Sequence, residues 1–307
     1  MKNKFHYIRA LIIPLLFVFI IMVSCQQQHK SEQTDVSSIQ PSAETGKLLL
    51  TDAEIAYQIY GEGEPLILCM GYSANMDLWE PKLINSLSKK YKVIVFDYRG
   101  MGHSTNSSFD FTIHTLAEDL NELCTHLNLE KVNVLGWSMG GYVAQEFAIG
   151  FPEKVNKLIL YATDAGGKSV IDPDDEVMKI LSDTTSTVQQ MTDILFPDNW
   201  SANHPESKKY FEHVHEPINR LTVKLQDNAV NDWLSERGGS YGSLYLLKTP
   251  TLIISGDVDK VVAIENSEIL FDSIANSTLI KVKNGGHGLM FQYPDVFTAF
   301  VNAFLDL

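Results

Sequence analysis

Three side chains that together can perform nucleophilic catalysis stand far apart in this chain: Ser138, Asp259 and His287. Ser138 is the central residue of the pentapeptide GWSMG (136–140). A serine hydroxyl is a poor nucleophile near neutral pH, so it needs a base within hydrogen-bond reach and a third group that orients the base. We therefore expect Ser138 to be an activated nucleophile.

Histidine is the natural base, and His287 lies in the glycine-flanked segment NGGHG (284–288), which follows an expected strand. The segment SGDVDK (255–260), also placed after a strand, offers two carboxylates as the orienting acid. We choose Asp259 and keep Asp257 as the alternative. The chain order is then nucleophile, acid, base.

The sequence around Ser138 predicts a sharp turn between a strand and a helix. The β-branched run 131–135 is typical of a strand, and residues 139–149 are typical of a helix that ends at Gly150, with Pro152 just beyond. Glycines two positions before and after Ser138 let neighbouring backbone pass close to it. The hydroxyl is thereby held at the tip of a sheet.

The remaining pattern predicts an α/β fold. An antiparallel start gives way to strands that alternate with helices, which implies right-handed crossovers and a parallel sheet covered on both faces. The helix near 116–127 has Thr112 or Thr115 as its cap. We expect strands at 47–50, 54–60, 66–70, 92–96, 157–161, 251–255 and 278–283, and further helices near 79–89 and 295–306.

A helical, proline-punctuated segment at about 165–245 interrupts this alternation. Inserted between two core strands, it predicts a lid that shapes the substrate pocket. Its aromatic residues either line an acyl pocket or form the lid's own core: Phe196, Trp200, Phe211 and Trp233.

With these motifs in this order, the chain resembles the α/β-hydrolase superfamily from about Leu48 to its C-terminus. The segment FDYRGMGHS (96–104) is similar to the loop after the fourth strand in the esterase and C–C hydrolase branches. The resemblance implies an acid three residues after Gly256, which matches Asp259. It also implies an oxyanion hole formed by the backbone N–H groups of Met139 and Tyr72, although Met70 replaces the family's usual histidine.

The resemblance implies a serine hydrolase that forms an acyl-enzyme, needs no cofactor or metal, and acts on a small-molecule carbonyl substrate. We favour a carboxylesterase for small or medium esters. A C–C bond hydrolase, a lactonase, a haloperoxidase and an aminopeptidase remain alternatives. An aminopeptidase would need lid carboxylates, and residues 172–176 offer them, although acidic residues also suit a helix N-terminus. A non-catalytic surface-binding protein is the alternative from another class.

The first 24 residues predict an export signal. Lys2, Lys4 and Arg9 precede an uncharged stretch at 10–23, which is short for a spanning helix of ~20 residues. Small residues before Cys25 resemble a bacterial lipobox, so we expect lipidation of Cys25; a plain cleaved signal or an uncleaved anchor is the alternative. The expected product is an exported, lipid-anchored enzyme at a bacterial membrane. The polar run 25–45 predicts a flexible linker before a hydrolase domain at 46–307.

The formal net charge of −14 becomes −17 once the signal's three cationic residues leave. A surface this acidic repels phosphate backbones, so nucleic acid is not an expected partner. We expect Cys69 and Cys124 to be buried thiols. The segment EHVHE (212–216) does not have the spacing that puts metal ligands on one helix face.

Overall fold

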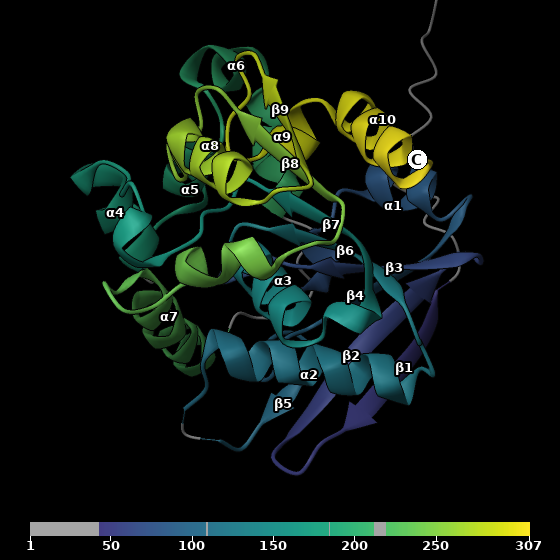
Figure 1. Ribbon diagram of the computed structural model, residues 1–307. Coiled ribbons are helices and arrows are strands. Elements are labelled where there is room, and N and C mark those ends of the chain that lie inside the picture. Colours follow the sequence, from purple (N-terminus) through teal and green to yellow (C-terminus); the bar gives the residue numbers. More distant parts are fainter. Residues whose placement is uncertain (1–42, 109, 184, 212–218) are drawn as a thin grey trace, which may run out of the picture. The chain divides into compact units, whose positions relative to one another are not determined.

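A computed structural model describes residues 43–108, 110–183, 185–211 and 219–307. Its strands form one nine-stranded sheet (Figure 1), in the order β1-β2-β4-β3-β6-β7-β8-β9, with β5 paired to β2. The strands are β1 (Glu44–Leu49), β2 (Ala53–Tyr60), β3 (Glu64–Cys69), β4 (Tyr91–Phe96), β5 (Thr105–Asn106), β6 (Val132–Trp137), β7 (Val155–Tyr161), β8 (Thr251–Gly256) and β9 (Ser277–Val282).

The sheet is antiparallel at its beginning and parallel from β4 onwards. Strand β2 pairs antiparallel with β1, β4 and β5, whereas β4, β3, β6, β7, β8 and β9 pair parallel with their neighbours. The central strand β6 is buried at every position, as expected for a parallel strand covered on both faces. Parallel strands end at the same edge, so the loops after β3, β6, β8 and β9 meet there.

Helices cover both faces of the sheet. Helix α1 packs against α10, and α2 packs against α3 on the opposite face (Figure 1). Thr112 caps α2 through a reciprocal pair with Thr115, so both predicted cap candidates take part. These core helices are α1 (Pro81–Leu87), α2 (Ile113–His126), α3 (Met139–Gly150), α8 (Ile264–Ser273), α9 (Leu289–Gln292) and α10 (Pro294–Leu305).

The long segment between β7 and β8 is helical wherever the structure describes regular elements in it. It contains α4 (Asp175–Ser182), α5 (Val188–Leu195), α6 (Asp198–Asn203) and α7 (Arg220–Leu234), with 3-10 helices before α4, between α6 and α7, and after α7. Within the described residues, no helix combines the length and the apolar character that crossing a membrane requires. The signal segment and Cys25 lie outside the described residues.

Most element boundaries differ from the sequence-based expectation by one to three residues, and the differences at α1 and β1 have a visible cause. The helix expected near 79–89 begins at Pro81, because proline suits the first helical position and the Glu80 carboxylate accepts the backbone N–H groups of Lys82 and Leu83. Strand β1 begins at Glu44, two residues before the expected domain start. Its partner strand β2 extends the pairing to that residue.

The two described cysteines behave as expected. Cys69 ends β3 and Cys124 lies in α2, and both are buried and free. Burial raises the pKa of the Cys124 thiol to about 12, so this side chain is a neutral part of the core.

Candidate active site

Ser138 occupies a strained turn between β6 and α3. Its backbone has φ 55° and ψ −122°, a left-handed φ that L-residues rarely adopt. Ser138 N–H donates to Tyr161 O at 3.0 Å, and Thr163 Oγ1 donates to Ser138 O at 2.8 Å. The neighbouring strand thus holds the turn from both sides.

Glycine is required on both sides of this turn. A Cβ on Gly136 would lie 2.3 Å from Gly140 O, and a Cβ on Gly140 would lie 2.0 Å from Cys69 O. Backbone atoms cannot move aside as a flexible side chain can. The spacing noticed in the pentapeptide therefore has a steric cause.

His287 and Asp259 are joined directly. His287 Nδ1 lies 2.9 Å from Asp259 Oδ2, and both side chains are almost completely buried. The other carboxylate oxygen, Oδ1, accepts the backbone N–H groups of Val261 and Val262 at 2.8 and 2.9 Å. The carboxylate is therefore fixed, and His287 has Nε2 left to face a reacting group. Asp257 is exposed, and its Oδ1 accepts Asn284 N–H.

The loop that carries His287 is fastened to the core and to the inserted segment. Tyr161 OH donates to His287 O at 2.6 Å, and the Trp137 ring lies 5.6 Å from the imidazole. Gly288 N–H donates to Leu195 O at 2.9 Å. A Cβ on Gly288 would lie 2.5 Å from the Phe196 ring, so the flanking glycine permits this close approach.

Backbone donors lie beside Ser138. Met139 is the first residue of α3, so its N–H has no partner within the helix and shares the positive end of the helix dipole. The loop after β3 abuts the serine, since a Cβ on Gly71 would lie 3.5 Å from Ser138 Cβ. Tyr72, the next residue, lines the same cavities as Ser138.

Helix α7 of the inserted segment grips this loop at two points. Tyr72 OH donates to Asp227 Oδ1 at 2.5 Å, and Ser73 N–H donates to Gln226 Oε1 at 2.9 Å. Burial and the Asp227 carboxylate raise the pKa of Tyr72, which keeps its hydroxyl a donor. Ser73 has a left-handed φ of 57°, so the loop is strained where α7 holds it.

The segment after β4, which carries part of the family resemblance, holds the loops beside the site in place. The buried Asp97 carboxylate accepts Met76 N–H at 2.7 Å and His103 N–H at 2.8 Å. Burial raises its pKa to about 6 against the effect of these bonds. Arg99 forms a two-point pair with Asp119, with both distances 2.7 Å. These contacts fix the loops next to the site without entering it.

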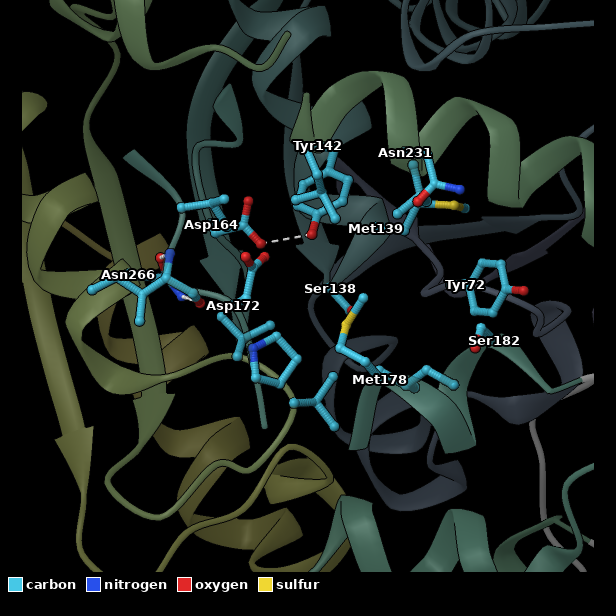
Figure 2. A pocket seen from close by; sticks show the side chains of 18 of the residues that line it. Tyr72, Ser138, Met139, Tyr142, Asp164, Asp172, Met178, Ser182, Asn231 and Asn266 are labelled. Carbon is cyan, nitrogen blue, oxygen red and sulfur yellow. Dashed lines mark hydrogen bonds between the residues drawn. The ribbon is translucent and has the colours of Figure 1, made fainter. Parts of the chain in front are cut away.

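Two cavities meet at Ser138. One, of about 200 Å³, is lined by Met139, and we name it the Met139 cavity (Figure 2). The other, of about 490 Å³, is lined by His287, and we name it the His287 cavity. Both cavities are also lined by Tyr72, Ser138, Leu181 and Val261.

The Met139 cavity contains Asp172, from the acidic run noted in the sequence, and two carboxylates that the sequence pattern did not single out, Asp164 and Asp227. Asp164 is 3% exposed and accepts Tyr142 OH at 2.6 Å and Gly166 N–H at 2.7 Å. Burial raises its pKa to about 6. Figure 2 shows Asp172 beside this pair, and Asp227 lines the same cavity. A polar residue just after a buried strand was the signal that could have identified Asp164.

The lid residues Phe196, Trp200 and Trp233 pack against other rings and are not among the residues that line either cavity. The Phe196 and Trp200 rings are tilted against each other with centroids 4.7 Å apart, and Trp233 stacks on Tyr142 of α3 at 5.1 Å. The side chain of Phe211 lies outside the described part of the structure. Of the acidic lid run, Asp172 lines the Met139 cavity, whereas residues 174–176 begin α4.

Comparisons with known proteins agree with this architecture. The family model for the alpha/beta hydrolase fold matches residues 64–199. A Synechocystis protein provisionally named a non-heme chloroperoxidase is 26% identical over 82% of this chain and 95% of its own length. The chain therefore has the α/β-hydrolase fold, and the matches support a hydrolase at that level.

Solved structures give the same result. An α/β-hydrolase fold protein from Chitinophaga pinensis superposes with a TM-score of 0.76 at 22% identity, covering 87% of this chain and 98% of that one. A thermophilic esterase from Thermogutta terrifontis superposes with a TM-score of 0.71 at 26% identity, covering 86% and 98%.

Proposed function

We propose that this α/β-hydrolase-fold protein is a serine carboxylesterase that works through an acyl-enzyme. The observation that carries the proposal is the pairing of His287 Nδ1 with Asp259 Oδ2 at 2.9 Å, while His287 and Ser138 line one cavity. A base oriented in this way beside a serine on a strained turn is the arrangement that activates a hydroxyl. The esterase among the similar structures supports the choice of esters.

In this mechanism the Ser138 Oγ–H bond breaks as Oγ bonds to the substrate carbonyl carbon, and the proton moves to His287 Nε2. Asp259 stabilises the imidazolium that results. The backbone N–H groups of Met139 and Tyr72 hold the oxyanion, each such donor contributing about 3 kcal/mol to the transition state. His287 then protonates the leaving oxygen, and water hydrolyses the acyl-enzyme by the same steps.

Labelling with a fluorophosphonate tests the proposal. The wild-type chain should be labelled and should hydrolyse 1-naphthyl pentanoate, and Ser138→Ala should lose both properties. Ser182→Ala is the matched control, because Ser182 lines the Met139 cavity without being at the turn. Labelling or turnover that persists in Ser138→Ala contradicts the assignment, and absence of labelling in the wild-type chain would favour a surface-binding protein.

We also propose that the enzyme is exported and held at a bacterial membrane by lipid on Cys25, behind the signal at 1–24. The order of cationic residues, apolar stretch and small residues before Cys25 supports this location. Metabolic labelling with a fatty-acid analogue should mark the full chain, and Cys25→Ser should remove the label. A labelled Cys25→Ser chain contradicts lipidation at this residue.

A further inference from the structure

The two cavities lie differently relative to the reacting groups, and this difference determines which part of a bound ester each cavity can hold. Building on the proposed function, we propose that the leaving group occupies the His287 cavity and the acyl chain occupies the Met139 cavity. The substrate class is then an ester of an apolar alcohol with an uncharged or cationic acyl group.

Proton transfer fixes the orientation. When the bond between the carbonyl carbon and the leaving oxygen breaks, that oxygen takes the proton from His287 Nε2. The leaving oxygen must therefore lie within hydrogen-bond reach of His287. His287 lines the larger cavity and is not among the residues that line the Met139 cavity. The acyl chain extends on the other side, where Met139 lines the wall next to the oxyanion.

The lining of the His287 cavity indicates an apolar leaving group. Apolar side chains from several elements line this cavity: Leu78, Ile180, Val188, Met191, Leu195 and Val223. The charged residues Asp183 and Arg220 are exposed, so they mark the mouth of this cavity. An alkyl or aryl alcohol would bury its apolar surface there at about 25 cal/mol per Å².

The lining of the Met139 cavity excludes an anionic acyl group. Its residues include Asp164, Asp172 and Asp227, and no Lys, Arg or His is among the described residues that line it. An acyl carboxylate would lose water and meet like charges with no cation to pair with it. A neutral chain can instead contact the aliphatic part of the wall, and a cationic end can face the carboxylates.

Three 1-naphthyl esters with the same alcohol test the acyl charge on the purified full chain: pentanoate, hemisuccinate and 4-(trimethylammonio)butanoate. We expect the hemisuccinate to have a kcat/KM at least about tenfold below the pentanoate, and the cationic ester to match or exceed the pentanoate. Equal hydrolysis of hemisuccinate and pentanoate overturns the charge selection. Absence of Ser138-dependent hydrolysis of all three contradicts the proposed function instead.

A pair of aspartates supplies the matched variants. Asp172→Asn removes a carboxylate from the Met139 cavity and should raise the ratio of hemisuccinate to pentanoate hydrolysis by about threefold or more. Asp183→Asn removes one at the mouth of the His287 cavity and should leave that ratio unchanged. An equal change in both variants would show a general effect of net charge and overturn the local argument.

A pair of methionines tests the orientation. Met178 lines the Met139 cavity and Met191 lines the His287 cavity. Met178→Trp should reduce kcat/KM for hexanoate relative to acetate esters of one alcohol, and Met191→Trp should do so for hexyl relative to methyl esters of one acid. A wild-type far-ultraviolet circular dichroism spectrum confirms that each variant is folded. The reverse pattern, in which Met191→Trp shortens the acyl preference, overturns the proposal.

Discussion

At the scale of single residues, the site depends on a carboxylate whose two oxygens both accept hydrogen bonds. Asp259 uses one oxygen for two backbone N–H groups and the other for His287, whereas Asp257 is exposed and bonds to Asn284 N–H. Orientation of the base therefore rests on Asp259. The sequence offered both carboxylates, and only the loop geometry distinguishes them.

Asp259→Asn should lower kcat by about 10³- to 10⁴-fold, because an amide can present an N–H to His287 Nδ1 and favour the tautomer whose Nε2 already carries a proton. Rates with 1-naphthyl pentanoate measure the effect. Asp257→Asn is the matched control and should stay within about threefold of wild type. A larger loss in Asp257→Asn than in Asp259→Asn would assign the acid to the alternative residue.

At the scale of elements, helix α7 holds the loop after β3 through two hydrogen bonds. Its residues Gln226 and Asp227 hold Ser73 and Tyr72, so the inserted segment fixes the loop that we propose supplies an oxyanion donor. A movement of α7 would displace that donor. The position of the lid and the geometry of the proposed oxyanion hole are therefore coupled.

Tyr72→Phe and Asp227→Ala should each lower kcat by about three- to tenfold, because either change removes one of the two hydrogen bonds by which α7 holds the loop. The double variant should be no slower than the worse single variant, since both delete one interaction. Asp227→Asn keeps an acceptor oxygen and should recover most of the rate. Effects that multiply in the double variant would show that the two side chains act independently.

Elements with a regular apolar pattern could be predicted, and those without one could not. Of the run 131–135, residues 132–135 lie within β6, and residues 139–149 lie within α3. Helix α8 gave no such signal, because its buried face includes the polar residues Asn266 and Ser267. The grip of Gln226 on Ser73 joins residues more than 150 positions apart, and no local pattern encodes such a contact.

At the scale of the whole molecule, a parallel sheet gathers the candidate residues at one edge. The protein core also contains buried carboxylates, and their ionisation at high pH lowers the free energy of unfolding. Asp97 has its pKa raised by burial from 3.8 to about 6. Between these values the folded state binds more protons than the unfolded state, so its contribution to the free energy of unfolding falls as pH rises. Above pH 6 the whole cost is present.

Asp97→Asn should therefore flatten the pH dependence of stability. The difference in unfolding free energy, variant minus wild type, should rise by up to about 3 kcal/mol between pH 4 and pH 7. Urea unfolding followed by tryptophan fluorescence measures it. The exposed Glu62→Gln is the control, whose difference should stay constant. A constant difference for Asp97→Asn would contradict the raised pKa.

The pairing of β7 with β8 also sets the order in which the chain can fold during synthesis. Leu158 pairs with Thr251 across the whole inserted segment. At about 5–20 residues per second, a ribosome needs several seconds to add that segment. Until then β7 has an open edge, and Asp259 and His287 do not yet exist. A nascent chain that already contains Ser138 is therefore inert, and its hydrophobic sheet edge needs protection from aggregation until β8 arrives.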